Sequence, residues 1–112
     1  MPDTKNLTRG RSAVLDATGA ATVVIGPDQG PANWHVTSLV FQTNRVNKAP
    51  VPRVQIYLDT VDPTNSLCVS SNGSWGQAVG DQTLSRGSHL VAVWTGGQAG
   101  DNATITVNGE MW

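Results

Sequence analysis

Hydrophobic and polar residues alternate along most of the chain, with the two-residue period of a β-strand that has one face on a core. No long window has apolar residues at the three-and-four spacing of an amphipathic helix. Glycine, proline, asparagine and aspartate separate the alternating segments at intervals of about eight to twelve residues, as turns do in β-proteins. The pattern therefore predicts an all-β fold, an antiparallel, jelly-roll-like β-sandwich of roughly eight strands.

The predicted strands follow one another without a helix between them. They are residues 7–16, 20–26, 33–43, 53–59, 66–70, 82–85, 88–95 and 102–109. Asn72-Gly73 is a strong signal for a short β-hairpin, and a glycine-rich loop at 96–101 separates the last two strands. We expect each of these turns to join two neighbouring strands of one sheet.

The longest predicted strand, residues 33–43, carries apolar side chains on both of its faces. Strict alternation puts Trp34 and Val40 on one face and Leu39 and Phe41 on the other. Such a strand either lies in the centre of a sheet or changes its facing residues at a β-bulge.

The predicted core consists of large apolar side chains on the inward faces of the strands. In segment 53–59, alternation points Ile56 inward and Tyr57 outward. Trp94 is expected to close one end of the interior, and the glycines that follow it are expected to supply turn positions. The predicted core residues are Trp34, Val54, Ile56, Leu58, Trp94, Ile105 and Val107.

The composition fits one domain of low charge. The chain has 112 residues, of which 13% are charged, and its formal net charge is −1. Charged residues usually make up about a quarter of a globular protein, and nucleic-acid binding usually needs a positive excess. We therefore expect no nucleic-acid partner. No apolar run approaches the length of a transmembrane helix or a secretory signal, so we expect neither a membrane segment nor secretion.

The one local charge bias lies near the N-terminus, where Lys5, Arg9 and Arg11 have no acidic residue between them. We predict that residues 1–11 form a flexible basic arm and that residues 12–112 form the β-sandwich domain. The arm could dock on a partner and become ordered only when it is bound.

No set of residues in the sequence has the spacing of a catalytic or metal site. The two histidines and the single cysteine lack the spacing of a zinc site, and there is no G-x-S-x-G motif. Most acidic residues lie in predicted turns, where they cap the backbone, and only Asp59 with Asp62 suggests a weak calcium alternative. We expect no enzymatic activity, no cofactor and no metal, and a packed thiol at Cys68.

The four tryptophans are the most informative residues for binding. Trp75 lies between glycine-containing segments and Trp112 is the last residue, whereas the other two lie inside predicted strands. An exposed tryptophan can fill a pocket of a partner or stack on a sugar ring. For Trp75, a place in the core stays open as an alternative. The candidate contact residues are Lys5, Arg9, Arg11, Trp75 and Trp112.

Three motifs follow one another along the chain. A Gly-Pro turn precedes a W-x-V strand in GPDQGPANWHV, and a Y-L strand precedes a P-x-N turn in YLDTVDPTN. The pattern G-x-x-L-x-x-x-W-x-G-G-x-x-G-x-x-A-x-x-T-V-x-G then runs from Gly87 to Gly109. Together these motifs, over roughly residues 20–109, resemble a group of small β-sandwich proteins encoded by tailed phages of actinobacteria.

The resemblance implies a non-enzymatic structural protein of the virion, made in the bacterial cytoplasm and repeated on the outside of the particle. Its partners would be major capsid or tail proteins, and capsid decoration is slightly favoured over a minor tail role. We expect a homo-oligomer, with a trimer as the favoured order because it fits threefold positions of a shell. The alternative is a carbohydrate-binding module for attachment to the host, suggested by Trp75, Trp112 and Tyr57 on a sandwich.

Overall fold

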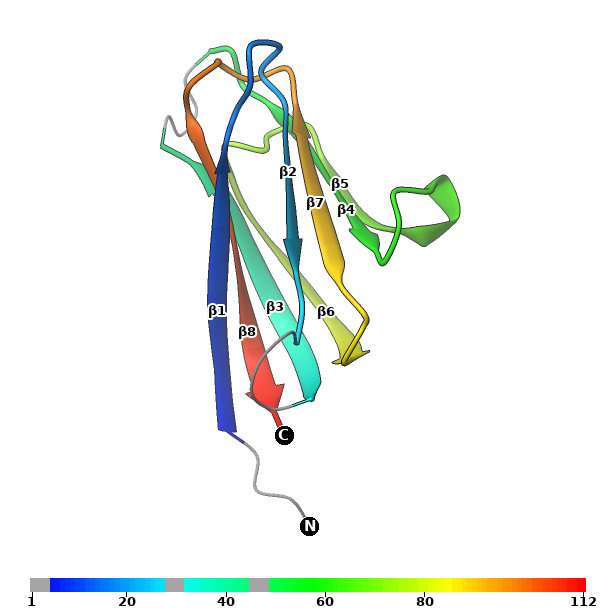
Figure 1. The fold of residues 1–112 in the computed structure, drawn as a ribbon. Helices are drawn as coiled ribbons and strands as arrows, with labels where there is room; N and C mark the ends of the chain where they lie inside the picture. The colour runs from blue at the N-terminus through cyan, green and yellow to red at the C-terminus, as the bar shows by residue number, and fades with distance from the viewer. Residues whose placement is uncertain (1–4, 28–31, 45–48) are drawn as a thin grey trace.

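The computed structural model describes residues 5–27, 32–44 and 49–112, and these contain eight β-strands and one 3₁₀ turn (Figure 1). The strands are β1 (Lys5–Val14), β2 (Ala21–Ile25), β3 (Asn33–Thr43), β4 (Arg53–Leu58), β5 (Ser66–Ser70), β6 (Trp75–Ser85), β7 (Leu90–Thr95) and β8 (Asn102–Met111). The 3₁₀ turn η1 (Pro63–Asn65) lies between β4 and β5. Asp62 caps this turn, because its side chain accepts a hydrogen bond from the backbone N–H of Thr64.

The strands form two four-stranded antiparallel sheets that pack face to face (Figure 1). Sheet A has the strand order β1-β8-β3-β6, and sheet B has the order β2-β7-β4-β5. Most successive strands cross between the sheets, and the first strand lies beside the last, as in a jelly roll. The structure confirms the predicted all-β, jelly-roll-like sandwich.

Both sheets turn an apolar face inward, and these two faces form one core. Leu58 is the single predicted core residue that is only half-buried, because it packs at the margin of the core. The other predicted core residues are buried: Trp34, Val54, Ile56, Trp94, Ile105 and Val107. The core also holds Leu7, Leu15, Phe41, Leu84 and Leu90.

Strand β3 carries a β-bulge, which explains why its sequence is apolar on both faces. Its register with β8 shifts between Val36 and Ser38, leaving one extra residue on β3. The shift turns Trp34 and Phe41 to the same side, where both are buried. Val40, expected to share the face of Trp34, therefore lies on the outer face. The predicted central position is also confirmed, because β3 pairs with β8 on one side and with β6 on the other.

Most connections cross between the sheets, so two expectations about hairpins are wrong. Asn72-Gly73 leads from β5 in sheet B to β6 in sheet A, and loop 96–101 leads from β7 in sheet B to β8 in sheet A. Turn residues show that the chain reverses direction, but the following strand can equally pack in the opposite sheet. Within the described ranges, β4 and β5 are the only consecutive strands that pair, and their hairpin projects from the sandwich (Figure 1).

Residues 5–11, expected to be a flexible arm, form most of strand β1. This strand pairs with β8 along its whole length, from Lys5 opposite Met111 to Val14 opposite Asn102. The segment is polar because β1 lies at the edge of sheet A, where Leu7 alone of residues 5–11 reaches the core. The expected boundary at residue 11 therefore falls inside a strand. Residues 1–4 of the expected arm lie outside the described residues.

Candidate binding surfaces

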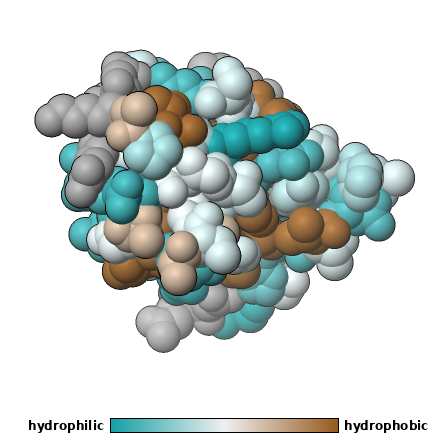
Figure 2. Space-filling view, turned by 90° about the horizontal axis from the view of Figure 1, so that it is seen from above, coloured by the Kyte–Doolittle hydropathy of each residue, from teal (hydrophilic) through white to brown (hydrophobic). Residues whose placement is uncertain are grey.

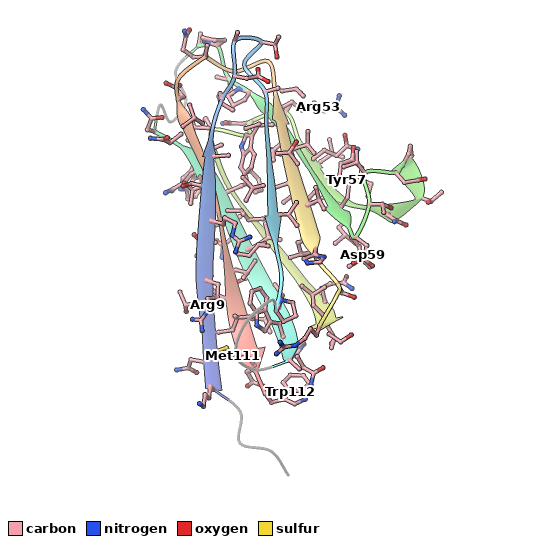
Figure 3. All side chains as sticks on the ribbon, in the orientation of Figure 1. Arg9, Arg53, Tyr57, Asp59, Met111 and Trp112 are labelled. Carbon is pink, nitrogen blue, oxygen red and sulfur yellow. The ribbon has the colours of Figure 1, made fainter. Side chains whose placement is uncertain are left out.

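The predicted basic contact residues lie in one row along β1. Lys5, Arg9 and Arg11 share one side of the strand and are exposed at the rim of the sandwich. The Arg9 guanidinium approaches Met111 Sδ at 3.9 Å, near the C-terminal end of β8 (Figure 3). The Arg11 guanidinium donates a hydrogen bond to the carbonyl oxygen of Val24 in β2 at 3.0 Å. Arg11 thus joins sheet A to sheet B, a structural role that the sequence did not reveal.

The aromatic residues proposed for sugar binding lie on separate parts of the surface. Trp75 begins β6 opposite Gln42 and has an exposed fraction of 53%. Trp112 exchanges two backbone hydrogen bonds with Asn33, at the other end of β3. The length of β3 between Asn33 and Gln42 corresponds to roughly 30 Å at about 3.3 Å per residue. Tyr57 points out from sheet B and not from sheet A, so one small ligand cannot touch all three rings.

The outer face of sheet B is mostly apolar, although Thr22 and Gln55 also lie on it. Val24, Val91 and Tyr57 lie side by side in one row across three strands, and Val93, Gln55 and Val69 do so in the next. The most exposed members are Val24 at 40%, Leu67 at 45% and Val69 at 48%. We define the apolar face by the side chains of Val24, Tyr57, Leu67, Val69, Val91 and Val93.

The apolar face shows that alternation predicts which way a side chain points, but not how exposed it is. Tyr57, expected to be exposed, has an exposed fraction of only 8%, although it lies on the outer face of β4. The exposed apolar residues do have a signal in the sequence. Residues 23–25 and 67–69 are apolar at consecutive positions, which makes both faces of a strand apolar.

The outer face of sheet A is mostly polar, and its charged residue Glu110 lies toward one end of the sheet, opposite Asn6 and His35. Its two central rows hold eight outward positions, which we define as the polar face. One row is Ser12, Thr104, Gln42 and Trp75, and the other is Gly10, Thr106, Val40 and Gln77. The side chains of Ser12, Gln42, Gln77, Thr104 and Thr106 form no hydrogen bond with any residue that the structure describes.

The titratable side chains described below hold turns in place or pack against the core, and they do not form a cluster. In the described ranges, no three His, Cys, Asp or Glu side chains are grouped so that they could hold a metal ion. Asp16 accepts a hydrogen bond from the Thr18 hydroxyl at 2.6 Å and two more from backbone N–H groups, which together hold the pKa of its carboxyl below the usual range. Burial raises the pKa of the Cys68 thiol, which disfavours the reactive thiolate.

No helix in the part of the chain that the structure describes is long and apolar enough to cross a membrane. No model of a known protein family matches the chain, and no curated protein matches it in sequence. Jelly rolls host many unrelated functions, so the fold alone does not assign one.

Proposed function

We propose that the protein is a non-enzymatic structural subunit on the exterior of a tailed-phage virion, docked in many copies on capsid or tail proteins. Capsid decoration is slightly favoured over a minor tail role, because one compact domain is enough for decoration. The sequence motifs and the jelly-roll architecture, which is common in viral capsid domains, both support this role. The observation that carries the proposal is the apolar face of sheet B.

The apolar face has exposed apolar side chains at its two edges, Val24 on β2 and Leu67 with Val69 on β5, and the largely buried Val91 and Tyr57 lie between them. Contiguous exposed apolar side chains mark interaction sites on globular proteins. Strand β5 adds an open sheet edge, since Ser66–Ser70 has neither a charged residue nor a proline to block pairing with another chain. Figure 2 shows hydrophobic surface on the side where the β4–β5 hairpin projects. A partner with an apolar patch or an exposed strand would fit this region.

The exposed area sets the strength of one docking contact. Val24, Leu67 and Val69 are each about half exposed, so burying one of them contributes about 1 kcal/mol, or half of the full transfer free energy. The three together contribute about 3 kcal/mol, which is weak for a single site. Stable attachment therefore needs several contacts at once, and a homo-oligomer such as a trimer would supply them.

The basic row contributes less to docking than the sequence suggests. Lys5 and Arg9 remain at the rim of the sandwich, where they could meet acidic groups of a partner. Arg11 is engaged with Val24, and its loss would loosen the sandwich as well as any contact. Trp75 lies on the polar face of sheet A, so it points away from a partner that is docked on sheet B.

The test is the content of purified virions of the phage that encodes the protein. Mass spectrometry and an electron microscopy map should find it there, with hundreds of copies for decoration and a few copies in rings for a tail role. Its absence from purified particles would refute the proposal.

Single substitutions test the docking surface. Leu67→Lys and Val69→Lys should leave a folded protein that is lost from the particles, because each places a charge in the apolar contact. The matched control is Val14→Lys, which changes an exposed strand valine on sheet A. Normal incorporation of both β5 variants would show that another surface docks.

A further inference from the structure

The polar face brings together several polar side chains that form no hydrogen bond with the described residues. Elsewhere the short polar side chains of Asp16, Asp62 and Asn72 bond to the backbone of their own turns. On the polar face, Gln42, Thr104 and their polar neighbours have no partner among the described residues. These amide and hydroxyl groups are therefore available to a ligand that can both donate and accept hydrogen bonds.

Trp75 stands at one end of this face on a rigid support. A Cβ on the adjacent Gly76 would come within 2.5 Å of the Phe41 ring, so the absence of a side chain lets β6 lie directly against the core. The turn before Trp75 is fixed as well, because the backbone N–H of Thr43 donates to the Ser74 carbonyl oxygen at 2.8 Å. Sites on rigid strands hold their side chains more precisely than sites on loops. The exposed indole is thus presented from a fixed backbone position.

We infer that the polar face binds a neutral oligosaccharide. The apolar side of a sugar ring would stack on the Trp75 indole, and the sugar hydroxyls would bond to the side chains of Gln42 and Thr104. The row from Ser12 to Trp75 crosses four strands at about 4.8 Å spacing, which gives a platform about 14 Å long for a short oligosaccharide.

The charge of the surface selects the class of sugar. None of the eight positions of the polar face carries a charged residue, whereas recognition of phosphate, sulfate or carboxylate groups usually relies on arginine or lysine. The described basic residues nearest this face are those of the β1 row, which point to the other side of that strand. An anionic glycan would therefore bind elsewhere, and a neutral one fits the polar face.

The experiment uses the purified wild-type protein on an array of neutral oligosaccharides of glucose, galactose, mannose and N-acetylhexosamines. The affinity of the best ligand is then measured by isothermal titration calorimetry, which does not depend on the indole of Trp75. Trp75→Ala should weaken binding about tenfold or more, as expected for loss of an aromatic stacking contact. Gln42→Ala should weaken it about fivefold, as expected for one hydrogen bond. Trp75→Phe should weaken binding less than Trp75→Ala does, because a smaller aromatic ring remains for stacking.

Two controls distinguish binding on the polar face from binding elsewhere on the molecule. Trp112→Ala removes an indole at the far end of β3 and should leave the affinity unchanged. Binding should also be insensitive to salt between about 0.05 and 0.5 M, since screening affects only charged contacts. No binding on the array, unchanged binding by Trp75→Ala, or strong salt dependence would each overturn the inference. The assay uses isolated protein, so its result is independent of whether the protein is found in virions.

Discussion

Replacement of Trp94 tests the assignment of this residue to the core. Its side chain is fully buried, and its indole Nε1 donates a hydrogen bond to the Gly73 carbonyl oxygen at 2.9 Å. Trp94→Ala should lower the free energy of unfolding by about 3–5 kcal/mol through the cavity it leaves, and the orphaned carbonyl places the value at the upper end. A domain of this size has a total stability of about 5–15 kcal/mol, so the variant should be marginally stable.

Trp94→Phe separates packing from hydrogen bonding. The phenyl ring keeps most of the apolar contact but cannot donate to Gly73, so we expect a loss of about 2 kcal/mol. Urea unfolding gives the free energies, and the melting temperature should fall by about 8 °C at about 4 °C per kcal/mol. The exposed Trp75→Ala is the control and should change stability by less than about 0.5 kcal/mol. If Trp94→Ala lowered the free energy of unfolding by less than about 1 kcal/mol, the assignment of Trp94 to the core would be refuted.

Three further predictions concern single groups. Gly109→Ala should cost more than about 2 kcal/mol in thermal unfolding, because its Cβ would collide with the His35 carbonyl oxygen; unchanged stability would show that β3 and β8 can separate there. The Thr18 hydroxyl and nearby N–H groups lower the pKa of Asp16, so its stabilising contribution is present above the unfolded value of 3.8 and is lost as pH falls through the lower folded pKa. Urea titrations at several pH values should show a smaller acid-induced loss for Asp16→Ala, and parallel pH profiles would contradict this. The raised pKa of Cys68 should make its alkylation by iodoacetamide at neutral pH slower than that of a free thiol, with the difference disappearing in denaturant.

Strand positions could be predicted because alternation reports which side chains are buried. The predicted bounds of β3 and β5 agree with the structure at both ends. Strand β6 is the exception, since alternation predicts only residues 82–85 but the strand begins at Trp75. Two glycines and several polar residues interrupt its hydrophobic pattern. Alternation identifies a strand only where its inward positions carry large apolar side chains.

Pairing and surface chemistry could not be predicted in the same way. Whether β6 pairs with β5 or packs in the other sheet depends on long-range burial, about which Asn72-Gly73 carries no information. The basic segment of β1 resembles an arm in sequence because an edge strand at the rim needs few apolar residues. Of the candidate contacts, Trp75 proved exposed, whereas Arg11 has a structural bond. The apolar face of sheet B and the polar face of sheet A became visible only when the registers brought distant segments together.

The β-bulge in β3 explains why the outer face of sheet A is mostly polar. If β3 alternated strictly from Trp34, Leu39 and Phe41 would point outward and Gln42 would point inward, and exposing the two apolar side chains would cost about 3–6 kcal/mol. The bulge returns both to the core, but it brings the β3 backbone so close to β8 that residue 109 has no room for a side chain. The close approach of β3 therefore explains why residue 109, at the end of the T-V-x-G motif, is a glycine. It permits the bulge, and the bulge separates a predominantly apolar interior from a face whose side-chain hydrogen-bonding groups have no partner among the described residues.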